Sequence, residues 1–293
     1  MYDIKALYEA ASVDDAVELL QQHPEARIIA GGSDVLIQLR EGRLADCELV
    51  SIQKLEELRG VELGPDQNLR IGAMTSFSHI TGNSLIQQYI PVLGEAVDMV
   101  GGPQIRNIGT IGGNICNGVT SADSASTLAA WEAVLEITGP DGVRQLPIDS
   151  FYLQAGKVAL APAELLTAII IPRASYKACY GHYIKYAMRN AMDIATLGCS
   201  VNVKLSADQR YVERVRIAYG VAGPVPMRAK TAEKTGNGQL VNAETVRKAA
   251  LAAREDVNPR TSWRASRELR LHLIEELACR AFTEAIMLAG GEI

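Results

Sequence analysis

The sequence predicts an α+β protein in which a larger N-terminal part is followed by a smaller C-terminal domain. Three observations support this class. The first forty residues alternate between strand-like and helix-like patterns, and short strand-like segments separated by turn residues follow them. From about residue 177 the pattern changes to three strand-like segments and then two helical ones. We therefore place a domain boundary near residues 174–180, which divides the chain into residues 1–176 and 177–293.

The first forty residues are expected to form a strand, a helix and a second strand. The helix is predicted from the segment SVDDAVELLQQHP, in which Ser12 suits the N-cap and Pro24 lies beyond the last turn. The second strand, ARIIAGG, runs into two adjacent glycines, Gly31 and Gly32. A glycine pair between apolar runs lets a tight turn bring its backbone against a neighbour.

The middle of the chain alternates between strands, turns and helices. CELVSIQKL and NLRIGAMTS are typical of strands, with the turn GPDQN between them, and IPVLGEAVDMVGG predicts a helix. SADSASTLAAWEAVLEI is expected to begin as a helix with small residues on its packing face and to end as a strand. That strand turns at GPDG into VRQLPI, and AELLTAIIIP predicts the last strand of this part.

The C-terminal part is expected to contain three strands and two helices. The strands are YIKYAMR, ATLGCSVNVKLS and VERVRIAYGVAG. The helices are NAETVRKAALAAREDV and RASRELRLHLIEELACRAFTEAIMLAGG.

Composition excludes several classes of protein. The 293 residues are enough for about two domains, and an apolar fraction of 48% is ordinary for a globular core. A net charge of −5 argues against nucleic acid as the main partner. Because no apolar run is long enough to span a bilayer and the first twenty residues contain acids such as Asp3, Asp14, Asp15 and Glu18, we expect a cytoplasmic protein without a signal peptide.

The cysteines and histidines do not form a metal site in the sequence. The five cysteines are odd in number and widely separated, so the sequence shows neither a disulfide framework nor the clustered thiolates of an iron–sulfur site. The four histidines are scattered and form no HExxH motif. We therefore expect this chain to bind no metal of its own.

Two glycine segments are the strongest functional signal. IIAGGSDVL (28–36) and IGTIGGNIC (108–116) share one pattern: an apolar approach, a glycine pair, a small polar residue and an apolar exit. Such a turn can present several backbone N–H groups to phosphate oxygens, and two of them could hold the two phosphates of a dinucleotide. A tight strand connection is the alternative for each turn alone. Neither a P-loop nor a GxGxxG fingerprint is present.

With AMRNAMDIA (187–195) and SWRASRELRLHLI (262–274), these glycine segments resemble the FAD-binding subunits of molybdenum hydroxylases, most closely those of bacterial xanthine dehydrogenases. The resemblance covers essentially the whole chain. It implies a vanillyl-alcohol-oxidase-type (PCMH-type) FAD-binding fold in two subdomains, residues 1–55 and 56–176. It also implies a C-terminal domain of the carbon monoxide dehydrogenase flavoprotein type, with a three-stranded antiparallel sheet and helices.

The resemblance also implies which residues bind the cofactor. In the family the two glycine segments approach FAD. The matching positions are Arg27, Ile28, Ile29, Ala30, Gly31, Gly32, Ser33 and Asp34 in the first segment, and Gly109, Thr110, Ile111, Gly112, Gly113 and Asn114 in the second.

Further single positions match family contacts. Asp123 matches an acidic FAD contact, with a helix N-cap as the alternative role, and Leu166 matches a backbone or apolar contact. Lys185 matches a lysine near the flavin ring that would stabilise negative charge on reduced flavin, with a solvated strand lysine as the alternative. Asp193 lies in a marked segment without an assigned role. Where eukaryotic relatives carry an aromatic residue, this chain has Gly101, so the flavin face is either more open or covered by another residue or chain.

The resemblance finally implies a role in electron transfer. The chain would hold FAD non-covalently, since no histidine lies in either glycine segment. It would receive single electrons from the [2Fe–2S] clusters of a partner chain and pass them as a pair to NAD, while a molybdopterin chain oxidises xanthine or a related purine. The alternatives are a quinone-type acceptor, a self-contained flavin oxidoreductase of the same fold, and an assembly subunit that has lost FAD.

Overall fold

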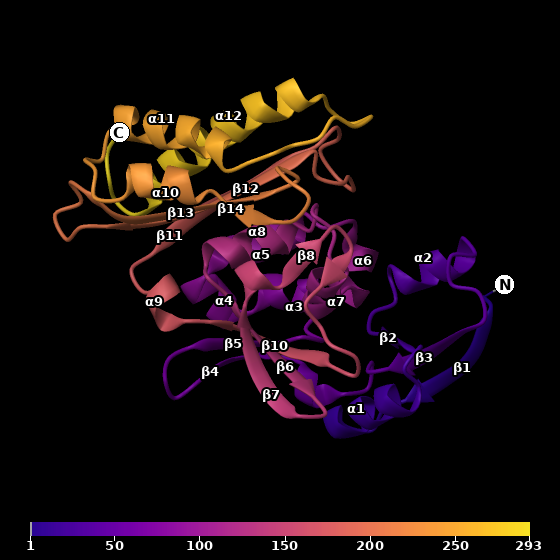
Figure 1. Ribbon diagram of the computed structural model, residues 1–293. Coiled ribbons are helices and arrows are strands. Elements are labelled where there is room, and N and C mark those ends of the chain that lie inside the picture. The colour runs from indigo at the N-terminus through magenta and orange to yellow at the C-terminus, as the bar shows by residue number, and fades with distance from the viewer. Residues whose placement is uncertain (1) are drawn as a thin grey trace.

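A small parallel sheet forms the N-terminal end of the chain in the computed structural model, which describes residues 2–293 (Figure 1). Its strands lie in the order β1-β3-β2 and pair in parallel. The elements are β1 (Ile4–Glu9), α1 (Val13–Gln22), β2 (Arg27–Ile29), α2 (Val35–Arg40) and β3 (Cys47–Ser51). The Ser12 hydroxyl accepts the Asp15 N–H, so the predicted N-cap of α1 is confirmed.

A five-stranded antiparallel sheet forms the middle of the molecule. Its strands lie in the order β4-β5-β10-β6-β7, with β10 at the centre. Six of the seven residues of β10 are buried, which explains its continuous apolar sequence. The strands are β4 (Val61–Leu63), β5 (Leu69–Gly72), β6 (Val134–Gly139), β7 (Gly142–Pro147) and β10 (Leu165–Ile171), and a small hairpin contains β8 (Tyr152–Gln154) and β9 (Lys157–Val158).

Short helices occupy the chain between β5 and β6, and one more follows β10 (Figure 1). They are α3 (Phe77–Gly82), α4 (Ser84–Tyr89), α5 (Pro91–Asp98), α6 (Pro103–Ile108), α7 (Ile111–Cys116), α8 (Asp123–Ala130) and α9 (Arg173–Tyr176). All eight residues of α8 are buried, and this helix contacts both β12 and β13 of the C-terminal sheet. The small residues expected on its packing face permit this close approach.

The C-terminal sheet has four antiparallel strands rather than the three predicted. The order is β11-β12-β13-β14. The extra strand, β14, contains two residues between a proline-rich loop and a helix, so it leaves no alternating pattern in the sequence. The elements are β11 (Tyr180–Tyr186), β12 (Leu197–Leu205), β13 (Val212–Gly220), β14 (Met227–Arg228), α10 (Lys230–Gly236), α11 (Ala243–Ala252) and α12 (Arg267–Leu288); the 3₁₀ turns of the chain are Glu56–Leu58, Ile148–Ser150 and Ala253–Glu255.

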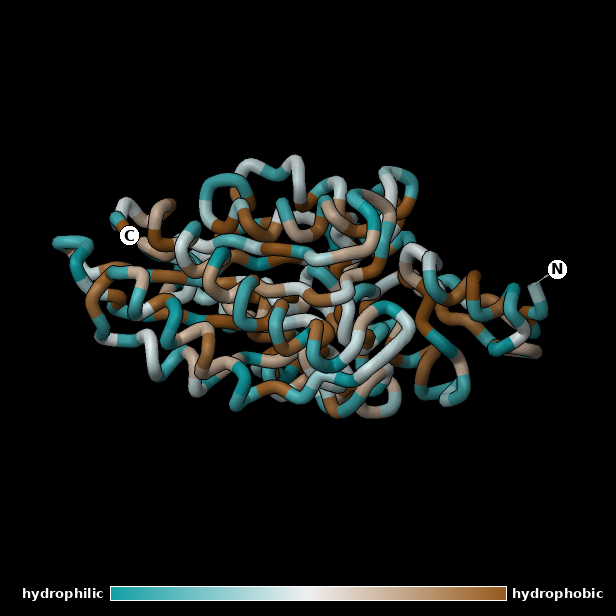
Figure 2. Tube along the Cα trace, turned by 90° about the horizontal axis from the view of Figure 1, so that it is seen from above, coloured by the Kyte–Doolittle hydropathy of each residue, from teal (hydrophilic) through white to brown (hydrophobic). Residues whose placement is uncertain are grey.

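Buried apolar side chains form three clusters along the chain. One lies under the N-terminal sheet, one between the middle sheet and its helices, and one between the C-terminal sheet and α10 to α12. Apolar segments run through the interior while polar segments lie at the outer loops, and the two termini are at opposite ends of the molecule (Figure 2). We propose that residues 1–55, 56–176 and 177–293 are folding units, and the clusters also join them, because the first cluster includes Met74 and Leu165 and the second includes Tyr183 and Ala218.

Candidate functional site

The first glycine segment connects β2 to α2 through a turn with unpaired backbone donors. Gly32 has φ +75°, a conformation that favours glycine. The N–H groups of Gly31, Gly32, Ser33 and Asp34 donate to no backbone carbonyl within residues 2–293, and the Asp34 side chain makes no capping bond. Three of these residues are half-buried and Asp34 is exposed, so the four donors form an accessible row. Such a row of amide groups suits phosphate oxygens.

The two glycine segments touch each other at Gly31. A Cβ atom on Gly31 would lie 2.0 Å from the carbonyl oxygen of Ile108 and 2.8 Å from its carbonyl carbon. Only a glycine therefore allows the turn after β2 to approach the last residue of α6. The sequence predicted two segments with the same pattern, and the structure brings them into direct backbone contact.

In the second segment, the first two amide groups of α7 form hydrogen bonds within the fold, so they are not free to bind a ligand. The Ile111 N–H donates to the Thr75 carbonyl at 3.0 Å, and the Gly112 N–H donates to the Ala73 carbonyl at 2.8 Å. A Cβ atom on Gly112 would lie 2.7 Å from both the Cβ and the carbonyl oxygen of Ala73. Gly112 is therefore required for the close approach of α7 to the end of β5.

Thr110 caps α7 and takes up the next two amides. Its hydroxyl accepts the Gly113 N–H at 3.1 Å, and its carbonyl accepts the Asn114 N–H at 3.0 Å. The prediction that the second segment presents free amide groups is therefore wrong from Ile111 to Asn114. Gly113 is itself exposed, and a Cβ atom there would lie 2.9 Å from the Thr110 hydroxyl oxygen.

Gly109 and Leu166, two more of the predicted site residues, are buried. Gly109 is buried, and its Cβ position lies 2.9 Å from both the Ile105 carbonyl oxygen and the Phe77 ring. Leu166 lies on β10 with a buried side chain in the middle core. The resemblance implies either a backbone or an apolar side-chain contact from Leu166 to the cofactor. Because the side chain is buried, the backbone contact is the one we expect.

A buried ionic cluster joins α5, α8 and β11. The Lys185 ammonium lies 2.8 Å from Asp123 Oδ2, and the Tyr183 hydroxyl donates to Asp123 Oδ1 at 2.6 Å. Lys185 also donates to the Met99 carbonyl at 2.9 Å. The side chains of Lys185 and Asp123 are only 7% and 6% exposed. These contacts give the carboxylate two donors and give the ammonium two acceptors.

Both alternative roles considered for these residues are wrong. Asp123 is the first residue of α8, whose N-cap is Ala122, and its carboxylate turns to Lys185 instead of capping the helix. Lys185 is buried rather than solvated. Burial raises the pKa of the Asp123 carboxyl above its usual value, and the opposing effects come from Lys185 and Tyr183. Burial, together with the Asp123 charge, also raises the pKa of Tyr183, so its hydroxyl remains a donor.

The contact between the two glycine segments at Gly31 and Ile108, here named the glycine junction, is connected to the ionic cluster through side chains. The Ser124 hydroxyl donates to Asn114 Oδ1 at 2.7 Å, which fastens the second glycine segment to the residue that follows Asp123. A continuous series of contacts therefore runs from Gly31 through Ile108 and α7 to the Asp123–Lys185 pair. An elongated ligand with a diphosphate and a ring could contact both ends of this series.

The loop after β11 lies beside Gly101, the position at which the family resemblance leads us to expect an aromatic residue. The Met192 methyl carbon would lie 3.4 Å from a Cβ atom on Gly102, next to Gly101. Asp193 accepts the N–H groups of Arg189 and Ile194 at 3.0 and 2.9 Å, so its carboxylate holds the turn that places Met192. This geometry gives Asp193 the structural role that the sequence left open.

Sequence reasoning missed Tyr183 and Ile108. Tyr183 stands two residues before Lys185 on β11, and residues two apart on a strand share one face, so its position was a usable signal. Ile108 contributes a carbonyl oxygen, and no residue type encodes that contact.

The part of the chain that the structure describes contains neither a metal-binding cluster nor a membrane-spanning helix. Within residues 2–293, no group of three histidine, cysteine, aspartate or glutamate side chains is placed to hold a metal ion. In the same part of the chain, no helix has both the length and the apolar character that a membrane crossing requires.

Comparison with known proteins gives a consistent result along the chain. Residues 2–174 match the family described as FAD binding domain in molybdopterin dehydrogenase, and residues 182–285 match the carbon monoxide dehydrogenase flavoprotein C-terminal domain. The xanthine dehydrogenase FAD-binding subunit of Escherichia coli O157:H7 is 43% identical over 293 residues, which is 100% of both chains. The carbon monoxide dehydrogenase medium chain of Hydrogenophaga pseudoflava is 30% identical over 94% of both.

Solved structures share the whole fold. A chain of carbon monoxide dehydrogenase from Hydrogenophaga pseudoflava, which lacks the Mo-pyranopterin moiety of its cofactor, superposes with a TM-score of 0.92 at 29% identity and 99% coverage of both chains. A chain of quinoline 2-oxidoreductase from Pseudomonas putida 86 superposes with a TM-score of 0.91 at 25% identity, again over 99% of each chain.

Proposed function

Since this chain belongs to the FAD-binding subunits of the xanthine dehydrogenase and carbon monoxide dehydrogenase type of molybdenum hydroxylase, we propose that it passes electrons from a partner's [2Fe–2S] clusters through FAD to NAD. The chain is an oxidoreductase subunit, because its relatives are dehydrogenase subunits with FAD-binding domains. The full-length match to a xanthine dehydrogenase subunit supports xanthine or a related purine as the substrate of the molybdenum partner.

The observation that carries this proposal is the row of amide donors from Gly31 to Asp34, held against the second glycine segment. This row suits the FAD diphosphate, because its four amide donors have no backbone acceptor within residues 2–293 and two of them belong to glycines. In the second segment, Gly113 is exposed as well. Arg27, Ile28 and Ile29 support the segment as strand β2, and Ala30 leads into its turn.

The chain's own residues would orient the cofactor and balance its charge. Bound FAD supplies the conversion between one-electron and two-electron transfer. Lys185 is fixed by Asp123 and Met99 at the far end of the series of contacts. A cation held there without a solvent shell stabilises negative charge on a reduced cofactor more strongly than an exposed lysine does. Tyr183 fixes the Asp123 carboxylate and thus the ammonium.

The partners follow from the same proposal. The xanthine dehydrogenase relative is named a FAD-binding subunit, so we place an iron–sulfur chain and a molybdopterin chain beside this one in a hetero-oligomer. All five cysteines are free thiols, which supports a cytoplasmic location.

The flavin is expected to be bound without a covalent bond. Precipitation of the purified chain with acid should release all the yellow colour into the supernatant, because neither glycine segment contains a histidine that would form a covalent tether to flavin. Absorbance spectra of supernatant and pellet measure this. Colour that stays with the denatured pellet contradicts non-covalent binding.

NADH is expected to reduce the flavin of the isolated chain, and Lys185→Ala should slow this step. Loss of the ammonium should lower the rate by about tenfold, equivalent to about 1.4 kcal/mol in the barrier, while FAD affinity changes less. Anaerobic stopped-flow bleaching and FAD titration measure the two quantities. Lys204→Ala on β12 removes a lysine that pairs with Glu213 and serves as the control.

Each outcome of the NADH experiment has a definite meaning. Equal bleaching rates in wild type and Lys185→Ala remove the charge role of Lys185. The absence of bleaching in a flavin-loaded wild-type chain contradicts NAD as the acceptor and favours a quinone-type acceptor. Purine oxidation by the chain alone contradicts its role as one subunit of a larger enzyme.

A further inference from the structure

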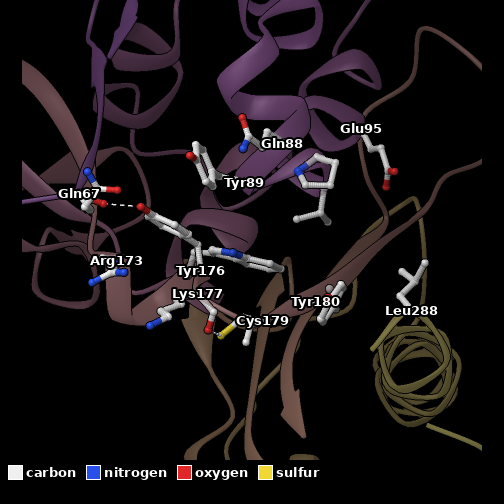
Figure 3. Close-up of a pocket in the computed structure, with 15 residues that line it drawn as sticks. Gln67, Gln88, Tyr89, Glu95, Arg173, Tyr176, Lys177, Cys179, Tyr180 and Leu288 are labelled. Atoms are coloured by element: carbon white, nitrogen blue, oxygen red, sulfur yellow. Dashed lines mark hydrogen bonds between the residues drawn. The ribbon is translucent and has the colours of Figure 1, made fainter. Parts of the chain in front are cut away.

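We propose that a second cavity, separate from the FAD-binding segments, binds a planar aromatic anion of one or two rings. The cavity has a volume of about 410 Å³ and lies between α4, α5, α9 and the start of β11 (Figure 3). Its volume is within the range of about 300–1,000 Å³ that is usual for small-molecule sites.

Aromatic side chains form the walls of this cavity. Tyr89 and Tyr176 contact each other with ring centroids 5.0 Å apart, and the other aromatic residues of the lining are the exposed Tyr180 and the edge of the buried Trp131. A Cβ atom on Gly181 would lie 1.9 Å from Trp131 Cη2, so Gly181 gives the indole its place. Stacked and edge-on contacts with such rings favour a planar ligand.

The walls are held in place before any ligand binds. The Tyr176 hydroxyl donates to the Gln67 carbonyl, as the dashed line in Figure 3 marks, and Trp131 is 1% exposed. The Arg173 N–H donates to Asn68 Oδ1 at 2.8 Å, which anchors the start of α9. Because these side chains are already ordered, little conformational entropy is lost on binding.

The charges around the cavity select an anion. Arg173 and Lys177 lie beside Tyr176 at one side of the cavity, while Glu95 and Leu288 lie at the other (Figure 3). Arg173 and Lys177 are both exposed, and neither forms a salt bridge to a carboxylate within residues 2–293. A carboxylate on the ligand would supply the missing partner, with its ring between the aromatic walls.

The cavity is distinct from the proposed FAD site. None of its lining residues belongs to either glycine segment or to the Asp123–Lys185 pair. Tyr180 and Lys185 lie five residues apart on β11, a separation of about 17 Å along an extended strand. Binding at the cavity can therefore be measured independently of flavin content.

Calorimetric titration of the flavin-loaded chain with 2-naphthoate tests this proposal. We expect one binding site that weakens at high salt, and markedly weaker binding of the neutral analogue 2-naphthamide. The double variant Arg173→Gln/Lys177→Gln should weaken naphthoate binding about fivefold, because each exposed cation contributes roughly 0.5 kcal/mol. Glu95→Gln should strengthen it, since a like charge is removed.

Lys234→Gln provides the matched control, because it removes an exposed lysine of α10 that does not line the cavity. Its affinity for naphthoate should equal that of the wild type. The proposal is overturned if millimolar naphthoate gives no binding heat, if the amide binds as tightly as the acid, or if the double variant and Lys234→Gln bind alike. Unchanged flavin absorbance in all variants shows that the fold and the FAD site are retained.

Discussion

Gly31→Ala is expected to abolish FAD binding while most of the fold remains. The added methyl group would lie 2.0 Å from the Ile108 carbonyl oxygen, and this backbone atom cannot turn aside as the end of a flexible side chain can. The two glycine segments must therefore separate, which misplaces the row of amide donors. The measurement is flavin absorbance per chain after purification, together with far-ultraviolet circular dichroism and a thermal melt.

The control for this variant is Gly82→Ala at the end of α3, where no atom lies within 4 Å of the Cβ position and φ is not positive. That variant should bind FAD normally and be as stable as the wild type or slightly more so. Full flavin occupancy in Gly31→Ala would contradict the role of the junction.

Gly32→Val and Gly113→Val extend the same test to the two sides of the junction. Gly32 needs positive φ, which a β-branched residue rarely adopts, and its Cβ position lies 3.2 Å from a Leu36 methyl group. Gly113 is exposed, and its Cβ position meets the Thr110 hydroxyl at 2.9 Å, so valine there must shift the cap of α7 and also fills the space beside it. We expect both to lose FAD, and a flavin-replete Gly113→Val would place the cofactor away from α7.

Asp123→Ala is expected to be the most destabilising single change at the site. It leaves the Lys185 ammonium buried without a carboxylate and removes the acceptor of the Tyr183 hydroxyl. Breaking one partner of a buried pair costs about 3–5 kcal/mol of unfolding free energy. Urea unfolding followed by circular dichroism measures this, with Asp98→Ala as the control, because Asp98 is 55% exposed in its pair with Arg106 and should cost below about 1 kcal/mol.

A double variant separates stability from function at the ionic cluster. Asp123→Leu/Lys185→Met replaces the buried pair with apolar side chains and should recover much of the lost stability. Reduction by NADH should remain slow in this variant, because the cation is still absent. Recovery of both properties would mean that the pair serves the fold alone.

The sequence was sufficient where a local pattern decides the structure. Ser12 capped α1 as expected, and the three long strands of the C-terminal sheet follow from alternating apolar residues. α2, α6 and α7 have six residues each, too few for a helical period to stand out, and β14 has only two. These elements depend on tertiary contacts that local propensity does not record.

The site shows the same division between local and tertiary information. Glycine pairs can be read directly from a sequence, and they indicate where the backbone can approach a neighbour closely because no side chain is present. The acceptors of the Ile111 and Gly112 amides are carbonyl groups of Thr75 and Ala73, which no pattern in the second segment reveals. Tyr183 reaches Asp123 because β11 packs beside the start of α8, and this tertiary contact is not encoded in the local sequence.

The most direct test of the central claim is a crystal structure of the chain with FAD. The account predicts the diphosphate within hydrogen-bonding distance, about 2.7–3.2 Å, of the amide nitrogens from Gly31 to Asp34. It also predicts the flavin ring at the end of the site formed by Asp123 and Lys185. A diphosphate bound away from the Gly31 turn, or a flavin ring remote from Lys185, would contradict it.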